Sequence, residues 1–142
     1  MKMEKVIKCN AIMNNLQDLW HQKIIGFYEE HEMSSAKIEI LSILDTKEKV
    51  TLYEIARVIS KPTSNVSPTL RKMANKGLLT KQVSQSDRRI VYFMISKKGK
   101  EVLDASKQFF DKLADELVSD ETLLDNLYNS LDVYASMIKK NV

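Results

Sequence analysis

Two short helical patterns, separated by only a few residues, constrain the fold of this chain more than any other feature. The first opens at Thr51, three residues before Glu54, which is the spacing of a capping box, and it ends before Pro62. The second covers residues 63–76 and stops at Gly77, a residue type that commonly follows the end of a helix. Two short helices joined by a tight turn predict a helix-turn-helix.

A pair of strand-like segments follows directly. Residues 78–83 and 90–95 are rich in β-branched and aromatic side chains, and the polar stretch SQSDRR joins them. We therefore expect a two-stranded ribbon, or wing, immediately after the helix-turn-helix.

Helical spacing of apolar residues predicts further helices on both sides of this unit. One covers residues 4–31, a second begins at a cap formed by Ser34 and Ser35, a third follows Gly99, and the last begins near Asp120. The predicted fold class is mainly α with a small antiparallel β-ribbon.

Positive charge is concentrated in the middle of the chain. Residues 50–100 hold 11 Lys and Arg against 2 acidic residues, a net charge of +9, whereas all 142 residues together carry +3. A basic middle between acidic ends is typical of a module that binds a polyanion.

The single cysteine and the short apolar runs indicate in which cellular compartment the protein is found. One Cys cannot form an internal disulfide, which is typical of a reducing cytoplasm. No apolar run approaches the ~18 residues of a membrane span, and charged residues and amides interrupt the N-terminus, unlike a secretory signal. We expect a cytoplasmic protein with no membrane partner.

The second short helix has one apolar and one polar face. Val66, Leu70 and Met73 share a face that we expect to be buried. The opposite side is small, polar and basic, carries no acid, and suits the major groove of double-stranded DNA. The residues predicted to contact DNA from this helix are Thr63, Ser64, Asn65, Ser67, Thr69, Arg71 and Lys72.

The wing tip offers two guanidinium groups. We expect Arg88 and Arg89 to reach the narrow minor groove beside the helix, where negative potential attracts arginine. Asp87 is expected to pair with one of them and fix its direction, which leaves the other to enter the groove.

Pro68 complicates the start of this helix. If Thr63 caps the helix, Pro68 lies in its interior and costs about 3 kcal/mol, whereas a cap at Ser67 places the proline at the tolerated first position. We favour a bent first turn, with phosphate contacts and the wing contributing more affinity than base readout.

Residues 55–103 resemble the MarR (multiple antibiotic resistance regulator) family of bacterial transcription factors. The helix-turn-helix, the KGLL that opens the wing, the DRR of its tip and the S-x-K-G-K that enters the next helix fall at the family's spacing. The resemblance implies a homodimer whose recognition helices enter successive major grooves of a pseudo-palindromic operator. It also implies a repressor that leaves DNA when a small-molecule effector binds.

The resemblance extends, as a pattern, over nearly the whole chain. It implies a single domain, residues 1–142, with a DNA-binding lobe at 34–100 and dimerisation helices in 1–33 and 101–142. Apolar stripes on the first helix and the last two exceed what this lobe can cover, which also favours a homodimer through helices 1, 5 and 6.

Other chemistry is weakly represented. Cys9 lies where redox-sensing relatives keep a reactive cysteine, but Met13 occupies the next helical turn where they place tyrosine, so we interpret Cys9 as structural and keep redox sensing as an alternative. His21 and His31 are too far apart in sequence to pair as metal ligands. Trp20, Phe27 and Tyr28 are candidates for lining an effector pocket, although core or dimer contact is the simpler interpretation.

These observations predict a DNA-binding regulator with no cofactor and no enzymatic activity. Neither a phosphate-binding loop nor a Ser-His-Asp spacing is present in the sequence. A winged-helix module that binds protein rather than DNA is the alternative, and the basic middle of the chain disfavours it.

Overall fold

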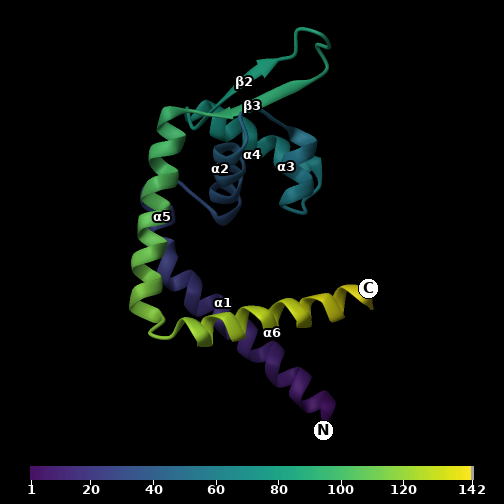
Figure 1. The fold of residues 1–142 in the computed structure, drawn as a ribbon, viewed down its shortest axis with the longest axis vertical. Helices are drawn as coiled ribbons and strands as arrows, with labels where there is room; N and C mark the ends of the chain where they lie inside the picture. The colour runs from purple at the N-terminus through teal and green to yellow at the C-terminus, as the bar shows by residue number, and fades with distance from the viewer. Residues whose placement is uncertain (142) are drawn as a thin grey trace. The chain divides into compact units, whose positions relative to one another are not determined.

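Residues 1–141 are described by the computed structural model and form six helices and three strands (Figure 1). The chain divides into two compact units, Met1–Leu103 and the remainder from Asp104. The predicted fold class is confirmed. The elements in chain order are α1 (Lys2–His31), α2 (Ser35–Thr46), β1 (Val50–Thr51), α3 (Leu52–Val58), α4 (Thr63–Asn75), β2 (Leu79–Val83), β3 (Val91–Ile95), α5 (Lys97–Leu117) and α6 (Glu121–Lys140).

The sheet of the first unit has three strands in the order β1-β3-β2, with antiparallel neighbours. β2 and β3 pair along their full lengths, and their ribbon extends beyond α2, α3 and α4 (Figure 1). The sequence predicted this ribbon but missed β1, which pairs Val50 with Phe93 and Thr51 with Tyr92. A strand of two residues is too short to show the alternation by which strands are recognised.

One face of this sheet covers the core of the first unit. Phe93 points into the core and is 7% exposed, whereas its neighbour Tyr92 lies on the outer face and is partly exposed. Apolar residues of α2, α3 and α4 complete the core beneath the sheet, and they include Ile40, Leu41, Leu44, Ile55, Val66, Leu70 and Met73.

The predicted caps of α2 and α3 are present. The Ser34 hydroxyl accepts a hydrogen bond from the backbone N–H of Lys37 at 3.3 Å. In the capping box, the Thr51 N–H donates to the Glu54 carboxylate at 2.8 Å, and the Glu54 N–H donates to the Thr51 hydroxyl at 3.3 Å. The Thr51 N–H lowers the pKa of Glu54, because it stabilises the ionised carboxylate.

Of the two predicted starts of α4, the one at Ser67 is wrong, and the one near Thr63 is confirmed to within one residue, because the cap is Pro62 and not Thr63. The helix begins at Thr63 with Pro62 as its N-cap, and the carbonyl of Pro62 accepts from the N–H groups of Asn65 and Val66. Pro68 therefore lies inside the helix, where its lack of an N–H leaves one intrahelical hydrogen bond unmade. Burial of the apolar stripe of α4 offsets this local cost, a tertiary effect that local rules for helix starts omit.

The end of α4 is a Schellman motif. The Gly77 N–H donates to the Ala74 carbonyl, and the Leu78 N–H donates to the Met73 carbonyl, both at 3.0 Å. Gly77 has φ of +74°, a conformation that glycine adopts without a Cβ penalty. The motif turns the chain directly into β2, so it joins α4 to the wing.

Apolar side chains remain exposed on the first helix and the last. In the first unit, the N-terminal two thirds of α1 exposes Ile7 at 59%, Leu16 at 48% and Trp20 at 44%. In the second unit, α6 has no buried residue, and its stripe exposes Leu127 at 47% and Leu131 at 41%. None of the helices in residues 1–141 combines the length and the hydropathy that a membrane span requires.

Candidate nucleic-acid interface

α4 separates its apolar and polar residues cleanly. Val66, Leu70 and Met73 are each at most 2% exposed, and they attach the helix to the core. Thr63, Ser67 and Thr69 are half-buried at the borders of this stripe. The residues opposite are all exposed, and we call them the outward face of α4: Ser64, Asn65, Pro68, Arg71, Lys72 and Asn75.

The chemistry of this outward face is that of a hydrogen-bond donor surface. Arg71 and Lys72 supply positive charge, and Ser64 and the two asparagines supply neutral donors and acceptors. The sequence of α4 contains no acid. Such a face is able to approach phosphate oxygens without repulsion.

The wing loop, residues 84–90, is held in shape by hydrogen bonds within itself. The Ser84 N–H donates to the Ile90 carbonyl at 2.9 Å, and the Ile90 N–H donates to the Asp87 carbonyl at 3.0 Å. The Ser84 hydroxyl accepts from the Asp87 N–H at 3.4 Å. These bonds place the two arginines at the end of the ribbon.

The two arginines differ in their partners. The Asp87 carboxylate accepts from Arg89 Nε at 3.1 Å, from Arg89 Nη2 at 3.2 Å and from the Arg89 backbone N–H at 3.0 Å. The Arg89 hydrogen bonds lower the pKa of Asp87. Arg88 is exposed and makes no hydrogen bond or ion pair with any residue of 1–141. One guanidinium is therefore oriented by the protein, and the other remains available to a ligand.

A single serine joins α4, the wing and α5. The Ser96 hydroxyl donates to the Gly77 carbonyl at the end of α4 and accepts from the Gly99 N–H at 3.0 Å, so it also caps α5. The Ser96 N–H donates to the Leu78 carbonyl at 3.2 Å. These bonds explain the spacing of the S-x-K-G-K segment, because they hold the wing at a set position relative to α4.

The end of α4 is also tied to α1, an arrangement that the sequence analysis missed. Lys76 Nζ lies 2.6 Å from Glu32 Oε2, and Lys98 Nζ donates to the Lys76 carbonyl at 2.9 Å. The hydrogen bond and the charge of Lys76 lower the pKa of Glu32. Lys98 belongs to the S-x-K-G-K segment, but its partner is 22 residues away, and no local pattern indicates that pairing.

A sequence profile of the MarR family matches residues 33–91, which include α2, the helix-turn-helix, β2 and the wing loop as far as the first residue of β3. This segment, which carries the helix-turn-helix, has a MarR-family sequence. Members of the MarR family are winged-helix transcriptional regulators and are not enzymes.

Individual relatives of the chain are distant in sequence. It is 19% identical over 110 residues to the HTH-type transcriptional regulator SarZ of Staphylococcus haemolyticus (strain JCSC1435), covering 78% of this chain and 75% of SarZ. The transcriptional repressor CouR, solved with a 23-mer DNA duplex, superposes with a TM-score of 0.76 at 22% identity, covering 89% of this chain and 91% of CouR. Reduced AbfR bound to DNA gives 0.75 at 18%, covering 98% and 97%. At these identities the two structures establish the shared fold.

The three predicted effector residues have different surroundings. Trp20 is 44% exposed, whereas Phe27 is buried and stacks on His31 with 4.2 Å between ring centroids. Tyr28 is half-buried, and its hydroxyl lies 2.9 Å from that of Ser35. All three lie on α1, and the effector pocket stays a prediction.

The remaining predicted sites concern Cys9 and the histidines. Cys9 is exposed on α1, and its alternative role as a redox sensor stays a prediction. His31 Nδ1 lies 3.1 Å from the Phe27 carbonyl, to which its protonated form donates. Among residues 1–141, no three or more His, Cys, Asp and Glu side chains gather closely enough to hold a metal ion.

Proposed function

We propose that this chain is a transcriptional regulator of the MarR family that binds double-stranded DNA sequence-specifically, with α4 in the major groove and the wing loop at the adjacent minor groove. The observation that carries the proposal is the exposure of Arg88 and of the basic outward face of α4. The major groove is about 12 Å wide and admits one helix. In this arrangement Arg71 and Lys72 of α4 contact phosphates or base edges, together with Thr63, Ser64, Asn65, Ser67 and Thr69.

The wing contributes one free and one oriented guanidinium. Arg88 enters the minor groove, where a narrow groove concentrates negative potential. Arg89 stays close to the loop, because Asp87 accepts two side-chain hydrogen bonds from it. Relatives of this fold support the DNA assignment, since CouR, AbfR and the Staphylococcus aureus protein MepR have been solved in complexes with DNA.

The proposed binding form is a homodimer. Exposed apolar side chains on α1 and α6 would otherwise face water over a large area, and a second copy of the chain covers such stripes in a symmetric dimer. The interface is proposed to involve α1, α5 and α6, within a single domain whose DNA-binding lobe is residues 34–100. Two lobes related by a two-fold axis match a pseudo-palindromic operator.

The proposed regulation is repression that ends when a small-molecule effector binds. Trp20, Phe27 and Tyr28 remain the proposed effector residues. The ring of Phe27 stacks on that of His31, and His31 lines a hollow of about 320 Å³ in the first unit together with Lys72 and Lys76 at the end of α4. This contact supports a route from Phe27 to α4. We keep the cytoplasm as the proposed location.

The experiment that tests DNA binding begins with selection from a random duplex library, followed by titration of the selected duplex. We expect specific binding that weakens steeply with salt, because each neutralised phosphate contributes about −0.9 to the slope of log K against log salt concentration. The matched variant is Arg71→Ala/Lys72→Ala, which removes both positive charges from the outward face of α4 and keeps the buried stripe of the helix intact. If selection enriches no sequence, or if the slope is near zero, the proposal is wrong.

A further inference from the structure

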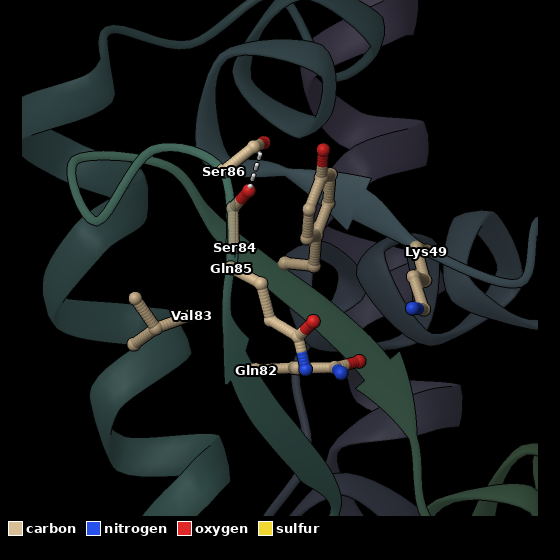
Figure 2. Close-up of a pocket in the computed structure, with 7 residues that line it drawn as sticks. Lys49, Gln82, Val83, Ser84, Gln85 and Ser86 are labelled. Carbon is tan, nitrogen blue, oxygen red and sulfur yellow. Dashed lines mark hydrogen bonds between the residues drawn. The ribbon is translucent and has the colours of Figure 1, made fainter.

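The outer face of the wing sheet carries a polar hollow that the proposed contacts of α4 and the wing tip do not use. Its volume is about 380 Å³, and we call it the wing hollow. Figure 2 shows the side chains of Gln82 and Gln85 directed to the same side of the sheet as that of Lys49. Its polar lining consists of Lys49, Gln82, Ser84, Gln85, Ser86 and Tyr92.

Register explains why these residues meet. Gln82 pairs with Tyr92 across the ribbon, so both side chains lie on the same face. Phe93, the next residue, points into the core, which places the Gln82–Tyr92 pair on the outer face. Lys49 directly precedes β1, and β1 pairs with β3 on its other side.

The ammonium of Lys49 is positioned but not neutralised. Its Nζ lies 5.9 Å from the centroid of the Tyr92 ring, within the range of a cation–π interaction. Lys49 is exposed and makes no hydrogen bond or ion pair with any residue of 1–141. The ring of Tyr92 therefore attracts the ammonium toward the hollow without satisfying its hydrogen-bonding capacity.

The other polar groups of the hollow are neutral and include several donors. The hydroxyls of Ser84 and Ser86 lie 3.0 Å apart, and each glutamine carries an amide N–H₂ group. No carboxylate belongs to the lining. One cation with several neutral donors matches an anion that presents several oxygens, and a phosphodiester is such an anion.

The hollow continues into the wing loop that carries Arg88. Ser86, at its edge, stands two residues before that arginine. The minor groove is only about 6 Å wide, so a side chain inside it has a sugar-phosphate strand close on either side. With Arg88 in the groove, one of the two sugar-phosphate strands would therefore pass the side of the loop on which Ser86 lies.

From these observations we infer that the wing hollow binds a backbone phosphate of the duplex, with Lys49 as its charged donor. The inference rests on the proposed function, and it adds a phosphate contact that lies outside the helix-turn-helix. Because a phosphate carries no base identity, this contact strengthens binding to all sequences equally.

The test compares full-length wild type with Lys49→Met in anisotropy titrations of a mixed-sequence duplex over a range of KCl concentrations. We expect the magnitude of the salt slope to fall by about 0.9, the share of one phosphate contact. Lys47→Met is the matched control. It removes the same charge at a position two residues before Lys49, and the side chain of Lys47 does not line the hollow. Lys49→Gln is a second variant, and thermal melting verifies that each protein is folded.

Each outcome decides the inference. If the wild type binds the duplex and Lys49→Met has the same salt slope, the inference is wrong but the proposed function stands. If Lys49→Met and Lys47→Met lose the same amount of salt slope, the inference is also wrong, because the effect then comes from the overall positive charge of the protein. A wild type that binds no duplex overturns the proposed function as well. Replacing chloride by inorganic phosphate at equal ionic strength separates the two phosphate sources. If inorganic phosphate weakens duplex binding by the wild type but not by Lys49→Met, and the two proteins have the same salt slope, the hollow binds free phosphate rather than the duplex. The inference is then wrong.

Discussion

Asp87 binds Arg89 through both of its carboxylate oxygens and leaves Arg88, the residue between them, without a side-chain partner. The wing thus presents one arginine whose direction is set by the protein and one that is available for DNA. The two neighbouring arginines therefore contribute to duplex binding for different physical reasons.

Replacing Arg88 by alanine should cost about 1–3 kcal/mol of duplex affinity, because it removes the guanidinium that enters the minor groove. Arg89→Ala should cost a similar amount, since it leaves the Asp87 carboxylate unpaired beside phosphates. Fluorescence anisotropy on the selected duplex measures both. Lys112→Ala, on exposed surface of α5, is the control, and light scattering should give the same oligomeric state for all variants. Losses below a few tenths of a kcal/mol for both arginine variants would refute the wing assignment.

The Asp87–Arg89 pair should also titrate. Arg89 lowers the pKa of Asp87 below 3.8, the ordinary value, so the pair is complete above 3.8 and is lost as pH falls through the lowered pKa. The backbone N–H of Arg89 reports this change, since it donates to Asp87. We expect its ¹H–¹⁵N resonance to move with a midpoint below 3.8. In Asp87→Asn the movement should vanish, and a midpoint above 3.8 in the wild type would contradict the pairing.

Gly26 and Gly99 should respond oppositely to alanine. A Cβ at Gly99 would lie 2.0 Å from the carbonyl oxygen of Leu78, so we expect Gly99→Ala to destabilise the protein by about 1–3 kcal/mol. At Gly26 a Cβ meets nothing within 4 Å, and alanine in a helix interior should stabilise by about 0.5–1 kcal/mol. Urea unfolding measures both. Equal changes in the free energy of unfolding for the two variants would contradict the close approach of Gly99 to the Leu78 carbonyl at the junction between the wing and α5.

Introducing a charge into the stripe of α6 should weaken the proposed dimer. Leu127→Asp places a carboxylate among apolar side chains that a second copy would cover, where an unpaired charge is costly. Sedimentation or light scattering should show a shift toward monomer, or loss of the folded protein. Asn129→Asp adds the same charge two residues along the helix and is the control. A folded, fully dimeric Leu127→Asp would remove α6 from the interface.

The sequence by itself determined the elements whose signals are local. The capping box of Thr51 and Glu54, the glycine after α4 and the division of α4 into an apolar and a polar face all depend on residues within one or two helical turns. The ribbon was equally predictable, because β2 and β3 are adjacent in the chain. Local rules failed at Pro68, where burial of Val66, Leu70 and Met73 outweighs the cost of an interior proline.

Only the tertiary structure decided which distant groups meet. The tie from Lys76 to Glu32 and the placement of Lys49 near the Tyr92 ring have no sequence signal. At the wing tip the sequence predicted that Asp87 pairs with one arginine, and the structure decided only that the partner is Arg89. The physical reason is one of range. Hydrogen bonds within a turn of helix are encoded by neighbouring residues, whereas ion pairs and ring contacts over tens of residues exist only after the core has set the helices and strands in place.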